Sequence, residues 1–408
     1  MKNNQIQNNI FILGGRTGGP LIPNMAIANA ISDSYSDYKF QKIIFGVKNG
    51  FETSYYQNEI KKLNPSFGLD LQIFYLPEVK LGFLSFKVAG FFPKMLKLIN
   101  TFFTLFTTFF TLFYSVSRCI FFIIKFKPVL ILNCGSFLAP PMIFAAVFLK
   151  KLSLSKAVIV THQQDPMPGI SNKLTNRLSD IQTAVFQYTI DNYPIFKNST
   201  IIPNPIDHQK FTIASKIGYQ NEKLGGFISN KKGKIPIILV YGGGSGSKNI
   251  NNFIQKNIPN LSKKFAVVHL LGTLQSQGDM ENWHNLGKNC ENYLCLDFLI
   301  GDMAKLILDA NVVISRAGLG SIGELLFLKK AGILIPLLNS HQELNAKIVE
   351  KDFLIMPENK LEIEKIIDFS RSAGFQNKSD LKWEYLPNTL KITTLIWEKI
   401  FKLLDKTK

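Results

Sequence analysis

The chain has 408 residues, of which 46% are hydrophobic and 19% charged, a balance that excludes a disordered protein and allows two or three domains with their own cores. Lysine and arginine outnumber aspartate and glutamate by 47 to 29, and the formal charge of +18 suits anionic lipid, phosphorylated small molecules or nucleic acid. We expect no nucleic-acid partner, because the sequence has neither a compact Lys/Arg block nor zinc-finger spacing.

Two features indicate a cytoplasmic protein. The polar N-terminus MKNNQIQNN runs directly into IFILGG and lacks the apolar region and cleavage site of a signal peptide. The cysteines form no CxxC pair and read as reduced residues: Cys119, Cys134, Cys290 and Cys295.

Apolar runs in the first half predict five strands, separated by segments long enough for helices: 10–14, 42–47, 71–76, 129–133 and 157–162. A polar, weakly periodic stretch over 207–234 predicts a boundary region. A second series of strands follows: 235–241, 265–272, 311–315 and 331–337. This alternation predicts an α/β protein with two Rossmann-like domains facing across a cleft. We place them at 1–206 and 235–385, with a helix in 386–408 packing back across both.

The segment 98–117, LINTFFTLFTTFFTLFYSVS, contains no charged residue and is flanked by lysines and an arginine. Its length would allow it to span a bilayer. However, the strands on either side of it should share one sheet, and a single crossing would separate them. We therefore expect an apolar helix or hairpin that lies in the plane of the cytoplasmic membrane face. The alternative is a fully buried, Phe-rich helix.

Both halves begin with a strand that ends in glycines. The first reads FILGGRTGGP, with Pro20 after Gly18 and Gly19, and the second reads GGGSG over 242–246. Such turns expose backbone N–H groups and can bind phosphate, although an ordinary tight turn has the same composition.

The stretch SRAGLGSIGELLF over 315–327 follows a predicted strand and opens a helix. Gly320 and Ser321 lie where the positive end of the helix dipole would favour a diphosphate. Arg316 can pair with a phosphate, and Glu324 can accept two hydrogen bonds from the vicinal diol of a ribose. The alternative is a plain strand-to-helix turn with a surface glutamate.

Two further polar clusters follow predicted strands. Gln342 and Asn345 are suited to binding sugar hydroxyls, although the same residues could simply start a polar helix. His162, Gln164 and Asp165 lie at the carboxyl edge of the first predicted sheet, where ligands bind. A lone histidine there is also commonly structural.

The sequence has no HExxH, Cys/His cluster, DxD pair, GxSxG elbow or GxxxxGK[ST] motif. Metal-dependent hydrolysis, serine hydrolysis and P-loop phosphoryl transfer are therefore disfavoured, and we expect no metal and no cofactor. The first glycine turn also lacks GxGxxG spacing, which argues against hydride transfer.

Six segments carry a further signal through their order and spacing: TGGPLIPNMA (17–26), HQQDPMPGISNKL (162–174), IIPNPID (201–207), YGGGSGSKNIN (241–251), DMAKLILDANVVISRAGLGSIGEL (302–325) and HQELNA (341–346). This series resembles the MurG family of peripheral bacterial transferases, which add N-acetylglucosamine to lipid I to make lipid II. The resemblance covers most of the chain, but not 207–234 or the Phe-rich segment.

The resemblance implies a glycosyltransferase-B fold whose N-terminal domain binds a polyprenyl-diphosphate acceptor and whose C-terminal domain binds UDP-N-acetylglucosamine. It implies donor contacts at Gly243, Gly244, Ser245, Ile300, Arg316, Gly320, Ser321, Glu324, Gln342 and Asn345. It implies acceptor contacts at Thr17, Gly18, Gly19, Pro20 and Gln164. It also implies a peripheral protein on the anionic, cytoplasmic face of the membrane.

The chain departs from the family pattern mainly on the acceptor side. Pro20 stands where the family has histidine, Gln163 where it has glutamate, and Asp165 where it has asparagine. Because Pro20 cannot accept a proton, Asp165 or His162 is the candidate base for an inverting, metal-independent transfer. A transferase that acts on another lipid acceptor, or a non-catalytic nucleotide-sugar binder, would also fit.

Overall fold

The computed structural model describes residues 8–15, 18–35, 40–47, 71–77, 91–202, 204–206, 208–273, 281–283, 285–286, 290–299, 301–374, 392–396 and 398, without the side chains of 18, 91–106, 208–209 and 374. Thr17, Ile300 and most of the predicted closing helix lie outside this set. The chain divides into two compact units, one comprising 1–164, 168–205 and 388–408, the other 165–167 and 206–387.

The first unit is built on a seven-stranded parallel sheet with the order β3-β2-β1-β4-β5-β6-β7. Its strands are β1 (Asn8–Leu13), β2 (Phe40–Gly46), β3 (Leu71–Tyr75), β4 (Leu130–Asn133), β5 (Val158–Gln163), β6 (Ile181–Ala184) and β7 (Thr200–Ile201). Its helices are α1 (Gly18–Ser34), α4 (Phe91–Phe126), α5 (Ala139–Lys151), α6 (Ile170–Thr175) and α7 (Gln187–Asn192), with short 3₁₀ turns at Asn176–Leu178 and Pro194–Phe196. The strand order reverses between β1 and β4, and in open α/β sheets ligands bind at the carboxyl ends of strands at such a point.

Apolar residues cover both faces of this sheet. One core cluster joins α1 to the sheet through residues such as Leu21, Ile27 and Ile31, and a second joins α4 and α5 to the other face. Continuous apolar strands are what a parallel sheet with two covered faces requires.

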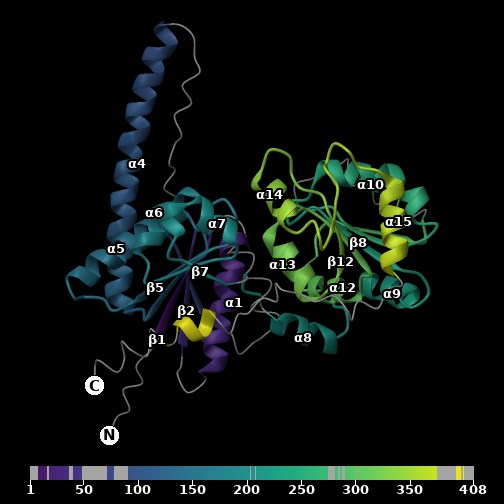
Figure 1. Cartoon of the computed structure of the whole chain (residues 1–408), viewed down its shortest axis with the longest axis horizontal. Helices are drawn as coiled ribbons and strands as arrows, with labels where there is room; N and C mark the ends of the chain where they lie inside the picture. Colours follow the sequence, from purple (N-terminus) through teal and green to yellow (C-terminus); the bar gives the residue numbers. More distant parts are fainter. Residues whose placement is uncertain are drawn as a thin grey trace. The chain divides into compact units, whose positions relative to one another are not determined.

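Helix α4 contains the Phe-rich segment as one continuous helix of 36 residues, about 54 Å long. Cys119, Phe122 and Ile123 are buried in the core, whereas Phe109 and Phe113 are 64% and 66% exposed. Figure 1 shows α4 continuing beyond the region where it packs on α5. The hairpin is wrong because the helix is continuous, and the fully buried helix is wrong for the described side chains because Phe109 and Phe113 are mostly exposed.

Within the described residues, Thr107–Phe126 is one helical stretch with the length and composition of a membrane span.

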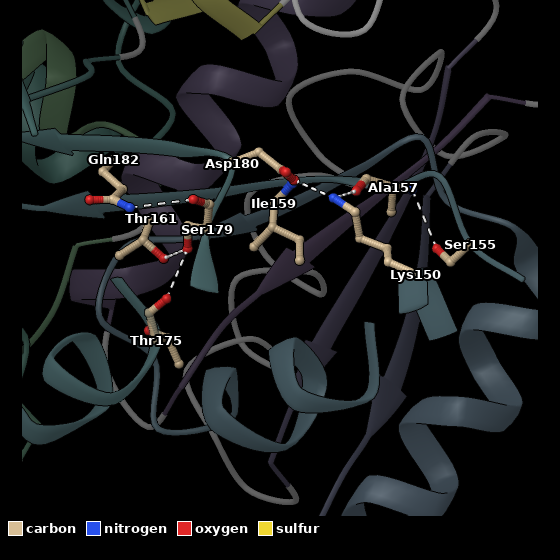
Figure 2. Close-up of polar contacts among 9 residues, drawn as sticks. All are labelled: Lys150, Ser155, Ala157, Ile159, Thr161, Thr175, Ser179, Asp180 and Gln182. Atoms are coloured by element: carbon tan, nitrogen blue, oxygen red, sulfur yellow. Dashed lines mark hydrogen bonds and ion pairs between the residues drawn. The ribbon is translucent and has the colours of Figure 1, made fainter. Parts of the chain in front are cut away.

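The amino-terminal edge of β5 and β6 is held by polar contacts (Figure 2). Lys150 on α5 pairs with Asp180 at 2.6 Å and donates a hydrogen bond to the Ala157 carbonyl at 3.1 Å. The same Asp180 oxygen accepts a hydrogen bond from the Ile159 amide at 2.8 Å. This edge is opposite to the carboxyl ends of the strands, so these charged residues stabilise the sheet and do not contribute to a ligand site at the carboxyl ends.

The second unit has a six-stranded parallel sheet with the order β10-β9-β8-β11-β12-β13. Its strands are β8 (Ile237–Tyr241), β9 (Ala266–Leu270), β10 (Tyr293–Leu296), β11 (Val312–Ser315), β12 (Ala331–Leu334) and β13 (Leu354–Ile355). Its helices include α8 (His208–Lys216), α9 (Glu222–Lys231), α10 (Lys248–Leu261), α12 (Met303–Asp309), α13 (Leu319–Phe327), α14 (His341–Ile348) and α15 (Ile363–Gly374).

The stretch 207–234, expected as a boundary region, instead contains α8 and α9 and belongs to the second unit. The loop between these helices is anchored because the buried Asp302 carboxylate accepts hydrogen bonds from the Gln220 and Asn221 amides at 2.8–3.1 Å. Such long-range contacts produce no periodic pattern in the local sequence, so the sequence did not predict that this stretch belongs to the second unit.

Candidate active site

The first glycine turn connects β1 to α1, and three of the predicted acceptor residues, Gly18, Gly19 and Pro20, form the first turn of that helix. Proline is tolerated there because the N–H groups of a first turn have no acceptor within the helix. The ring of Pro20 packs beside Gly15, 3.6 Å from the position a Cβ would take there. Pro20 therefore shapes the turn.

Gln164 holds this turn from the end of β5. Its Nε2 donates hydrogen bonds to the Gly19 carbonyl at 3.0 Å and to the Cys134 carbonyl at 2.8 Å. Pro23, four residues after Gly19 inside α1, has no N–H, so the Gly19 carbonyl lacks its usual helical donor. Gln164 replaces that donor. Direct contact between Gln164 and an acceptor stays a prediction, and the geometry favours a positioning role.

Two more side chains fix the same turn, and sequence reasoning missed both. Ser136 donates a hydrogen bond to the Gly14 carbonyl, and Asn24 donates to the Leu13 carbonyl at 3.0 Å. Asn24 also accepts a contact from the Cys134 thiol at 2.9 Å. Asn24 is completely buried, and its polar side chain among the apolar residues of α1 is the feature by which the sequence could have indicated its role.

The two candidate bases lie in different environments. His162 is completely buried within β5, with Nδ1 2.8 Å from the Thr183 hydroxyl, and burial lowers its pKa to about 4. It is therefore neutral at pH 7 and inaccessible to solvent, which favours a structural role.

Asp165 follows the strand, and its side chain is 42% exposed. Desolvation raises its pKa, opposed by the charge of His341 and a hydrogen bond with Asn345. The Oδ1 atom lies 3.9 Å from Nε2 of His341, next to the predicted sugar-binding residues of α14. The base assignment stays a prediction, and the partly exposed Asp165 fits it better than the buried His162.

The second glycine turn connects β8 to α10. Ser247 caps α10, and a Cβ on Gly242 would lie 2.4 Å from the Ser247 nitrogen, so only glycine lets the turn close. Gly243, Gly244 and Ser245 are exposed at its tip, as a phosphate-binding loop requires.

The loop after β9 packs directly on this turn. Gly272 has φ +90°, and a Cβ there would lie 2.1 Å from the Gly246 nitrogen. Thr273 donates to the Gly244 carbonyl through its amide at 3.1 Å and through its hydroxyl at 3.3 Å. Sequence reasoning missed both residues; the glycine that ends an apolar strand was the available signal.

Arg316 at the end of β11 is committed to protein acceptors. Its guanidinium pairs with Glu358, whose side chain is 4% exposed, and donates to the Ser247 hydroxyl at 2.6 Å. It also donates to the Ile335 and Pro336 carbonyls, both at 3.3 Å. The expected phosphate contact stays a prediction, while the observed contacts make Arg316 a support for the cap of α10.

Helix α13 begins at Leu319, with Gly318 as its N-cap, slightly earlier than the sequence predicted. Gly320 is exposed and Ser321 half-buried in its first turn, consistent with access to a ligand phosphate. Glu324 lies one turn further, and its carboxylate pairs with Lys210 of α8 at 2.5 Å.

The two predicted sugar-binding residues also hold backbone. Gln342 accepts a hydrogen bond from the Leu337 amide at 3.1 Å, and the buried Asn345 donates to the Ala317 carbonyl at 3.1 Å. Asn345 thereby fixes the turn that leads into α13. Among the described residues, no group of three or more His, Cys, Asp or Glu side chains could hold a metal ion.

Comparison with known proteins shows which family this chain resembles. The model of the glycosyltransferase family 28 C-terminal domain matches residues 237–373. The UDP-N-acetylglucosamine–N-acetylmuramyl-(pentapeptide) pyrophosphoryl-undecaprenol N-acetylglucosamine transferase of Clostridium tetani is 29% identical over 369 residues, which cover 89% of each chain. The protein of the same name from Bacillus cytotoxicus is 26% identical over 84% of this chain and 83% of its own. Over most of its length the chain is similar to the MurG family of glycosyltransferases.

Solved structures support the predicted fold. MurG from Acinetobacter baumannii matches with a TM-score of 0.61 at 18% identity, over 96% of this chain and 99% of its own. A UDP-GlcNAc 2-epimerase from Neisseria meningitidis, bound to UDP-GlcNAc, matches with a TM-score of 0.60 at 13% identity, over 97% and 100%. The predicted glycosyltransferase-B fold is confirmed.

Proposed function

We propose that this glycosyltransferase transfers N-acetylglucosamine from UDP-N-acetylglucosamine to polyprenyl-diphosphate-linked N-acetylmuramyl-pentapeptide, converting lipid I to lipid II. The observation that carries the proposal is the match to the Clostridium tetani transferase over 89% of both chains, because that protein's name describes this transfer. The exposed Gly243–Ser245 tip and the first turn of α13 support it as donor-side phosphate contacts.

The reaction is a single displacement. The acceptor hydroxyl attacks the anomeric carbon of the donor sugar, Asp165 takes the hydroxyl proton, and the bond to UDP breaks with inversion. The leaving diphosphate gains negative charge, which the N–H groups of the Gly242–Ser247 turn and the positive end of α13 stabilise without a metal.

The acceptor is a membrane lipid, so the protein should bind the cytoplasmic membrane face as a peripheral protein. The exposed phenylalanines of α4 and the basic residues Arg118, Lys125 and Lys127 support this location. Sedimentation with anionic vesicles should be reduced in Phe113→Ser but not in Tyr188→Ser, an exposed aromatic on α7. Equal sedimentation of both variants would contradict docking through α4.

The function itself is tested by incubating the full chain with UDP-N-acetylglucosamine and lipid I and following lipid II formation. Turnover of only another lipid acceptor, or nucleotide-sugar binding without turnover, would replace the proposal with one of the two alternatives.

A further inference from the structure

The Lys210–Glu324 ion pair joins two helices that are distant in sequence. The two charged atoms lie 2.5 Å apart, with 32% of the Lys210 side chain and 18% of the Glu324 side chain exposed. Lys210 therefore orients the side chain to which we assign the donor ribose.

The pair is held by packing between α8 and α13. The next residue, Phe211, is 4% exposed, and its ring centre lies 5.9 Å from that of Phe327 on α13. Ile206, just before α8, packs on Gly323, where an added Cβ would lie 3.1 Å from its Cδ1. The segment that carries Lys210 is thus fixed beside the middle and the end of α13, and the Lys210 side chain is partly exposed.

Two other cations of the second unit contact mainly backbone or structural side chains. Arg316 is bound by Glu358, Ser247 and two carbonyls, and Lys330 donates to the Leu308 and Ala310 carbonyls at 2.6 and 2.8 Å. Lys210, by contrast, contacts a predicted donor-binding side chain. Ribose and diphosphate are adjacent in a nucleoside diphosphate, so an ammonium paired with a ribose-binding carboxylate would be close to the phosphates.

We propose that Lys210 is a donor-binding residue that orients Glu324 for the ribose diol and presents its ammonium to the diphosphate. This inference rests on the proposed function, because it assumes that the second unit binds a uridine-diphosphate sugar. Lysine suits this double role, since its ammonium carries three donors on a flexible stem and can bridge a carboxylate and a phosphate.

The test compares Lys210→Met with wild type and with Lys216→Met, which removes the same charge from the exposed last residue of α8. UDP and uridine are titrated into each full-length protein by calorimetry or by competition. Lys210→Met should weaken UDP binding about tenfold to a hundredfold, as expected for a charge-assisted contact, and weaken uridine binding less. Its UDP affinity should also depend less on salt, whereas Lys216→Met should match wild type.

Wild-type-like UDP affinity in Lys210→Met would overturn the inference while leaving the proposed function intact. Equal losses for UDP and uridine would overturn the diphosphate contact. Failure of wild type to bind UDP would instead overturn the proposed function. Lys210→Arg keeps the charge, so it should recover most of the UDP affinity and serves as the test if the Met variant is unstable. An Arg variant that folds but binds UDP as weakly as Lys210→Met would contradict the phosphate role.

Discussion

The two glycine turns have the same position in their sheets but are built differently. In the first unit, side chains from neighbouring elements hold the backbone: Ser136 binds the Gly14 carbonyl and Gln164 binds the Gly19 carbonyl. In the second, two backbones meet directly, because Gly272 leaves room for Gly246. The first turn should therefore be sensitive to removal of a neighbouring side chain, and the second to addition of a single carbon.

The largest expected effect concerns Asp165, which follows the first sheet but contacts residues of the second unit. Asp165→Asn should reduce turnover about a hundredfold or more, because general base catalysis contributes at least that much, and leave affinity for UDP-N-acetylglucosamine within a few-fold. His162 is the other candidate base. His162→Ala should change turnover much less if the protein remains folded, because His162 is buried away from solvent. Steady-state kinetics of both variants distinguish the two residues, and full activity in Asp165→Asn would remove it as the base.

The pH dependence provides a second measurement on Asp165. The base must be ionised, and desolvation raises its pKa. As the pH falls, kcat/KM should therefore decline at a pH above the ordinary aspartate pKa of about 3.9. A decline centred at or below 3.9 would contradict this assignment.

The second effect tests the backbone contact between the two loops. Gly272→Ala should weaken donor binding by about a hundredfold, because the new Cβ would overlap the Gly246 backbone and the residue has positive φ. Gly226→Ala on α9 is a matched control with no atom within 4 Å of the new Cβ, and it should bind as wild type and gain up to about 1 kcal/mol in unfolding free energy. Normal UDP binding in Gly272→Ala would contradict the comparison of the turns.

Glu324→Ala should weaken UDP binding about tenfold to a hundredfold through the loss of charge-assisted hydrogen bonds to the ribose. Glu324→Gln should lose less. Replacing the donor ribose by 2′-deoxyribose should reduce the affinity of the Ala variant less than that of the wild type. Equal sensitivity to the missing hydroxyl in both proteins would remove Glu324 from the ribose site.

A smaller effect tests the side-chain support of the first turn. Gln164→Ala removes two hydrogen bonds to backbone carbonyls and should raise the acceptor KM about fivefold to tenfold, with donor KM unchanged. Gln187→Ala, on the exposed start of α7, is the control. An unchanged acceptor KM in Gln164→Ala would show that the turn does not depend on this side chain.

The smallest expected effect is that of metal removal. Backbone N–H groups and the helix end can stabilise the leaving diphosphate, so an excess of chelator should leave turnover unchanged. Loss of activity that magnesium or manganese restores would contradict this scheme of charge stabilisation.

The sequence alone determined the local elements with strong patterns. The continuous apolar runs predicted β1, β4, β5, β8 and β11 to within a few residues, because strands buried on both faces need apolar residues throughout. The short edge strands β7 and β13 and the polar β6 were not predicted, since two to four residues give too weak a pattern.

Only the tertiary structure determined which partners the site residues meet. Arg316 meets Glu358, 42 positions away, and Lys210 meets Glu324, 114 positions away. The order of the strands and the packing of helices on them create these contacts, and no local spacing encodes them. The sequence could thus indicate which side chains suit a phosphate, a ribose or a proton. Tertiary packing decided that Arg316 supports a helix cap, that His162 is buried and that Lys210 pairs with Glu324.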